Sequence, residues 1–79
     1  MSEKDHILKE TVTIGREQAA ERLREIADML DAGAFVDGGA PLEIPEQIVY
    51  ELDVARKEKH GEMRFEIEAE VHWRQPIEG

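Results

Sequence analysis

The stretch that decides the fold is residues 62–73, EMRFEIEAEVHW. Its odd positions carry only apolar side chains: Met63, Phe65, Ile67, Ala69, Val71 and Trp73. Its even positions carry only charged or titratable side chains: Glu62, Arg64, Glu66, Glu68, Glu70 and His72. Because successive side chains of a strand point to opposite faces, this period of two predicts a strand with one apolar face and one acidic face.

The segment that precedes this strand, residues 47–57 (QIVYELDVARK), alternates in the same way. We expect its inward-facing side chains to be Ile48, Tyr50, Leu52 and Val54. Gly61 predicts a turn between the two segments. A two-residue turn at His60-Gly61 pairs Val54 with Ile67 and Ile48 with Trp73. A four-residue turn shifts the register by two residues, and the same side chains then still share a face.

Residues 16–32, REQAAERLREIADMLDA, have the three- and four-residue apolar spacing of an amphipathic helix. The predicted apolar stripe consists of Ala19, Ala20, Leu23, Ile26, Ala27 and Leu30. Gly15 is the expected N-cap, and Gln18 stands where a capping box places Glu or Gln. Gly33 is expected to end the helix in a left-handed conformation.

Two further segments complete the expected order of elements. Residues 7–14, ILKETVTI, predict a strand at the edge of a sheet, where the charge of Glu10 protects against aggregation. Residues 34–46, AFVDGGAPLEIPE, predict a small hairpin or a tight irregular loop around Asp37-Gly38-Gly39-Ala40.

Together these elements predict an α+β fold in the order β-α-ββ-ββ. We expect an antiparallel sheet of four to five strands with one helix packed on one face. The chain has 79 residues and is expected to form a single domain, 1–79. The ordered core should cover about residues 7–74, with frayed ends at residues 1–6 and 75–79.

Composition narrows the class of function. Nineteen acidic residues against ten basic ones give a formal net charge of −9. This charge disfavours binding to nucleic acid and to anionic membranes. The chain has no cysteine, which excludes thiolate catalysis and cysteine-based zinc sites. Its charged first ten residues predict no signal peptide, and no segment has the apolar length of a membrane span, so we expect a cytoplasmic location.

The helix and the final strand together resemble a known family. Glu17, Ala19, Ala20, Leu23, Ile26, Ala27, Leu30 and Gly33 on the helix, followed by hairpins and by an acidic amphipathic strand from Phe65 to Trp73, are similar to the amphi-Trp domain. The likeness spans roughly residues 8–73. It differs at Gly15, where relatives usually have a serine-like cap. The resemblance implies a small prokaryotic domain without an established activity, and it supports the architecture alone.

One surface is a candidate for function. Glu66, Glu68 and Glu70 share a face, and a two-residue turn places Ala55, Asp53 and Glu51 opposite them. Like charges directly opposite each other are destabilising, so stability alone does not explain this face. The candidate partner-binding face comprises Glu51, Asp53, Glu66, Glu68, Glu70 and His72.

The expected function is a non-catalytic protein-interaction module that uses this acidic face or an edge strand. Its partner would be a basic protein or a second copy of the chain. The alternatives are a salt-adapted accessory protein without a defined ligand, or weak divalent-cation binding by the carboxylates. We expect no enzymatic activity, no cofactor and no dedicated metal site, because His6, His60 and His72 lack a ligand spacing and an open sheet face offers no cleft.

Overall fold

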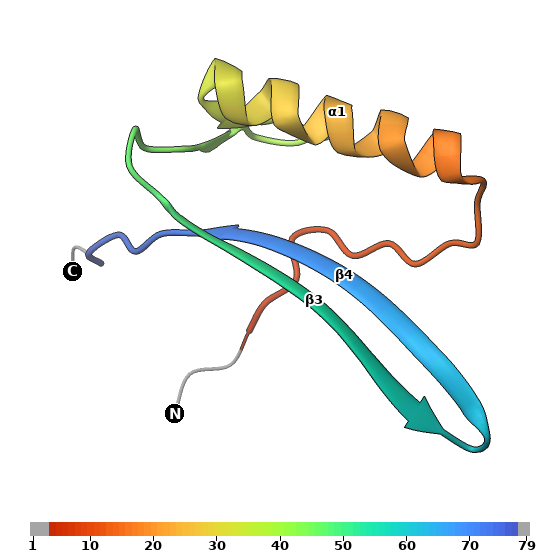
Figure 1. Cartoon of the computed structure of the whole chain (residues 1–79). Coiled ribbons are helices and arrows are strands. Elements are labelled where there is room, and N and C mark those ends of the chain that lie inside the picture. The colour runs from red at the N-terminus through yellow and green to blue at the C-terminus, as the bar shows by residue number, and fades with distance from the viewer. Residues whose placement is uncertain (1–3, 78–79) are drawn as a thin grey trace.

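The computed structural model describes residues 4–77. Within this range the chain forms one helix, α1 (Arg16–Ala32), and four strands: β1 (Ala34–Phe35), β2 (Leu42–Glu43), β3 (Val49–Lys59) and β4 (Glu62–His72), shown in Figure 1. β1 pairs with β2 in one antiparallel sheet, and β3 pairs with β4 in a second. The predicted α+β class is therefore confirmed.

Helix α1 has the predicted bounds and the predicted caps. The Gly15 N–H donates to the Gln18 side-chain oxygen at 3.0 Å, which is the half of a capping box that a glycine N-cap permits. Gly33 ends the helix at φ 85°, and its N–H donates to the carbonyls of Met29 and Leu30. No helix in the described part of the chain has the length and apolar character needed to cross a membrane.

The small hairpin predicted for residues 34–46 is present. Ala34 lies opposite Glu43 and Phe35 lies opposite Leu42. The Ile44 N–H donates to the Gly33 carbonyl at 2.9 Å, so this hairpin is attached directly to the end of α1.

The long hairpin of β3 and β4 adopts the register of a two-residue turn. Val54 lies opposite Ile67, and the ladder runs from Lys59–Glu62 to Val49–His72. His60 and Gly61 both have positive φ, 54° and 77°, as a type I′ turn requires. The ladder ends one residue short of the expected pairing of Ile48 with Trp73.

The prediction of a strand at residues 7–14 is wrong. This segment is extended, but it pairs with no described strand. Its β-branched composition gives only a propensity, and a strand also needs a partner edge. Glu10 has another contact, since its carboxylate accepts a hydrogen bond from the Arg22 Nε at 2.8 Å. This bond, followed by the one to Glu25, raises the pKa of Arg22 above its usual value. Because the pair is exposed, it adds little to stability.

A single sheet of four to five strands under a helix is not confirmed. Among residues 4–77 the strands form two separate two-stranded sheets. No Cα atom of α1 lies within 8 Å of a Cα atom of β3 or β4. Figure 1 shows the helix above the hairpin, with the separation between the two increasing toward the turn.

The structure also differs from the sequence prediction in its lack of a buried core among residues 4–77. No described residue is buried. On α1, Leu23 is 61% exposed, while Arg22 and Met29 are half-buried beside Ile26 and Leu30. The expected inward residues of β3, Tyr50, Leu52 and Val54, are all more than half exposed. Trp73 is half-buried and lines one apolar groove with Ile26 and Leu30 of the helix.

The turn of the long hairpin generates a prediction. Replacing Gly61 with alanine should lower the free energy of unfolding by about 1–2 kcal/mol, because an L-residue is strained in a left-handed conformation. Chemical denaturation followed by circular dichroism, at one fixed protein concentration, measures the change. Gly39→Ala is the matched control, since Gly39 has no positive φ and no atom within 4 Å of an added Cβ. Equal losses in both variants would contradict the assigned turn.

Candidate functional site

All six predicted site residues lie on one face of the long hairpin. Glu51 and Asp53 come from β3, and Glu66, Glu68, Glu70 and His72 come from β4. They share this face because directly opposed residues of an antiparallel pair point to the same side and the period of each strand is two. We call these six residues the acidic face.

The predicted like-charge pairs are present on the acidic face. Glu51 lies opposite Glu70, and Asp53 lies opposite Glu68. These four residues and Leu52 line a shallow depression. In the range that the structure describes, Asp53 and Glu68 form no ion pair. Their repulsion is therefore uncompensated within the chain, and a cation from outside would relieve it.

Glu66 differs from the other carboxylates of the acidic face. It lies opposite Ala55, and its carboxylate forms an ion pair with Arg64, whose Nε lies 2.8 Å away. Its side chain is only 29% exposed. Because its charge is balanced by a neighbour on the same strand, Glu66 is the carboxylate least available to a partner.

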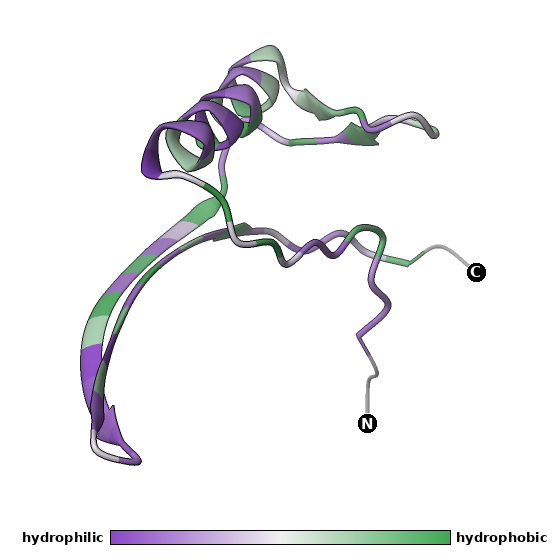
Figure 2. Cartoon of the chain, turned by 90° about the vertical axis from the view of Figure 1, so that its right-hand side faces the viewer, coloured by the Kyte–Doolittle hydropathy of each residue, from purple (hydrophilic) through white to green (hydrophobic). Residues whose placement is uncertain are grey.

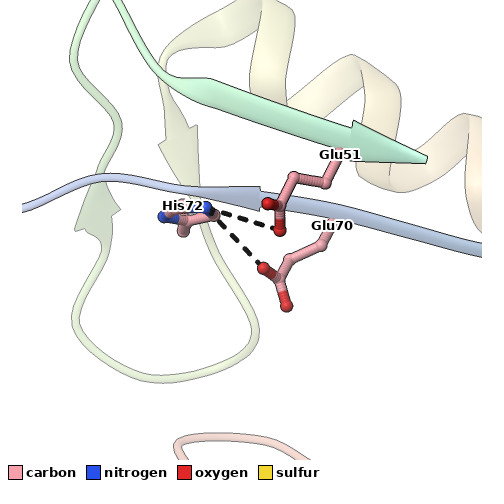
Figure 3. Close-up of side chains that lie close together, drawn as sticks. All are labelled: Glu51, Glu70 and His72. Carbon is pink, nitrogen blue, oxygen red and sulfur yellow. Dashed lines mark ion pairs between the residues drawn. The ribbon is translucent and has the colours of Figure 1, made fainter. Parts of the chain in front are cut away.

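Glu51, Glu70 and His72 converge at one end of the acidic face. The His72 Nε2 lies 3.7 Å from the Glu51 carboxylate and 3.8 Å from the Glu70 carboxylate (Figure 3). One ligand atom from each of the three residues lies within 4.8 Å of the other two. Two carboxylate oxygens and one imidazole nitrogen suit a divalent transition metal, although all three side chains are exposed.

Sequence reasoning placed these three residues on one face but missed their convergence. The signal that could have found it is the register, since Glu51 opposes Glu70 and His72 follows Glu70 by two residues on the same side. A search for ligand spacing along a single strand or helix does not detect a set that two strands complete.

Sequence reasoning also missed the opposite charge at the other end of the hairpin. Lys57 lies opposite Arg64, which is a like-charge pair of basic residues, and Lys59 lies beside the turn. We call residues 56–65 the hairpin tip, and residues 49–55 with 66–72 the hairpin base. The tip carries four basic side chains (Arg56, Lys57, Lys59 and Arg64) and two carboxylates (Glu58 and Glu62). The base carries five carboxylates and no lysine or arginine.

The uncompensated carboxylate pair generates a prediction. Glu68→Lys should raise the free energy of unfolding by about 0.2–1 kcal/mol at low salt, because it turns the repulsion with Asp53 into attraction. The gain should shrink as added salt screens the pair. Glu66→Lys is the control with the same charge change, because it faces Ala55 and removes the ion pair with Arg64. Denaturant titrations at two salt concentrations measure both. An equal gain in the control would assign the effect to net charge instead.

Comparison with known proteins agrees with the architecture. Neither the curated proteins nor the solved structures include a match to this chain. The family model of the Amphi-Trp domain matches residues 1–79, the whole chain. The amphipathic strand β4, with Trp73 directly after it, lies within that match. The chain belongs to the Amphi-Trp domain family.

Proposed function

We propose that this protein is a small non-catalytic interaction module of the cytoplasm, whose acidic face docks on a basic protein. The observation that carries the proposal is the pair of opposed carboxylates, Asp53 and Glu68, together with Glu51 and Glu70 beside them. Natural sheets usually place opposite charges in such positions, because like charges cost stability. A lysine or arginine of a partner that enters the depression over this face would be attracted to these carboxylates and would relieve their mutual repulsion.

The edges of the long hairpin offer a second docking element. Within residues 4–77 the outer edges of β3 and β4 pair with no other strand. A partner strand added at an edge would bind through backbone hydrogen bonds. It would also extend the sheet toward the four or five strands expected from the sequence.

The test is affinity capture from a cell lysate with three baits. The wild-type chain should retain basic proteins, and the variant with Glu51→Lys, Glu68→Lys and Glu70→Lys should lose them. The control bait carries Glu17→Lys, Glu21→Lys and Asp28→Lys on the exposed surface of α1, which gives the same change in net charge. Capture should survive in the control. Equal capture by all three baits would rule out the acidic face.

The convergence of Glu51, Glu70 and His72 supports a second candidate function, weak divalent-cation binding. Three exposed ligands leave the rest of the coordination shell to water, so the expected affinity is low. In calorimetric titration with zinc chloride, the wild-type chain should release heat and His72→Gln should not. Glu68→Gln, which changes a carboxylate outside the cluster, should behave as wild type. No heat from the wild-type chain would end this candidate.

A further inference from the structure

The face of the long hairpin opposite the acidic face is apolar and uncovered. We call it the apolar hairpin face: Tyr50, Leu52, Val54, Met63, Phe65, Ile67, Ala69 and Val71, with the charged Arg56 and Glu58 at its tip end opposite Phe65 and Met63. Exposure is 73% for Phe65 and 78% for Ile67, and it is 50% or more for Tyr50 and Met63. Figure 2 shows green apolar segments along a hairpin that curves away from α1. Soluble monomers rarely leave so continuous an apolar surface in water.

The total exposed area of the chain indicates how large an interface it can form. The chain exposes 8105 Å², whereas a compact protein of 9.0 kDa exposes about 4,900 Å². Its radius of gyration is 15.7 Å, against about 11.6 Å for a compact chain of 79 residues. The excess area is roughly 3,200 Å², far more than the about 800 Å² that each partner buries in a standard transient interface. An excess of this size fits an obligate partner, and homodimers with two-fold symmetry are the commonest obligate assemblies.

The chain also presents a receptor for the apolar hairpin face. The groove between α1 and the hairpin base has a volume of about 260 Å³, and its walls include Ile26, Met29, Leu30, Val71 and Trp73. A cavity of about 150 Å³ is enough to hold a benzene ring. The groove therefore has room for a side chain such as Phe65. Val71 belongs to both surfaces, so the groove opens on the same side of the hairpin as the apolar face.

The positions of the groove and of the uncovered side chains select the orientation of the second copy. The groove lies at the hairpin base, whereas Phe65 and Ile67 lie nearer to the turn. An antiparallel arrangement therefore places the uncovered side chains of each hairpin over the groove of the other. The charged pairs Lys57–Arg64 and Glu51–Glu70 lie on the same side of the hairpin as the acidic face and stay outside this interface.

We propose that two copies of the chain form an antiparallel two-fold dimer through their apolar hairpin faces, in which the tip of each hairpin packs over the groove of the other. Phe65 and Ile67 of each copy lie against the partner's groove, and the interface completes a core that one chain does not form. The acidic faces remain on the outside of the dimer. This inference is independent of the proposed docking of a basic protein, because it uses the opposite face of the hairpin.

Sedimentation equilibrium of the purified chain is the first test. The expected mass is twice 9.0 kDa, and the thermal midpoint should rise with protein concentration, because dissociation accompanies unfolding. A folded chain that sediments at 9.0 kDa at all concentrations, or as a larger assembly, would overturn the proposal. Ile67→Lys should raise the dimer dissociation constant at least tenfold. Ile77→Lys, the same change at a side chain 97% exposed outside the hairpin, should leave it unchanged.

Cross-linking through introduced cysteines tests the orientation, because the chain has no cysteine of its own. One variant carries Phe65→Cys on the apolar hairpin face, and the other carries Met29→Cys in the groove. Under oxidising conditions an equimolar mixture should form disulfide-linked dimers at least tenfold faster than Phe65→Cys alone, because each Phe65 lies against the partner's groove. Faster cross-linking of Phe65→Cys to itself than to Met29→Cys would overturn the antiparallel arrangement.

Discussion

The register of β3 against β4 is the constraint on which the rest of this structure depends. Because the strand period is two, a slip of one residue would move every apolar side chain to the acidic face. The two-residue turn holds the register with two consecutive residues at positive φ, His60 and Gly61. The same register sets Glu51 against Glu70, Asp53 against Glu68 and Lys57 against Arg64. One turn therefore determines the apolar face, the acidic face and the charge difference between tip and base.

Residues 4–77 form secondary structure without enclosing a core. Its helix and its small hairpin are joined by the bond from Ile44 to Gly33, and the long hairpin extends away from both. Small domains have little apolar area to bury, and a domain with no buried side chain has little to offset the loss of conformational entropy. Association that covers the apolar hairpin face would supply that area, so folding and assembly would be a single process.

The net charge of −9 conceals an ordered pattern along the hairpin. Acidic residues occupy the base and basic residues dominate the tip, and each region contains a like-charge pair across the strands. The pattern costs stability within one chain and divides the outer face of the hairpin into an acidic part and a basic part. The two faces of the hairpin can then have separate roles. The apolar face suits a second copy, and the acidic face remains open to a basic partner or to a cation at Glu51, Glu70 and His72.

The local features of this protein follow from short segments of its sequence. Helix α1 and its two glycine caps follow from contacts within a few residues, as do the type I′ turn and the alternation of β3 and β4. With the turn known, the six residues of the acidic face follow as well, because register and period place them together.

Which surfaces these elements bury depends instead on their arrangement in space. The segment of residues 7–14 has the composition of a strand, but it pairs with no described strand, and Glu10 contacts Arg22 on the helix instead. Leu23 belongs to the apolar stripe by spacing, yet it is exposed and does not line the apolar groove that Ile26 and Leu30 line. Periodicity identifies a face that avoids water. The identity of the surface that covers it depends on contacts between residues far apart in the sequence or on separate chains, and local patterns do not encode those contacts.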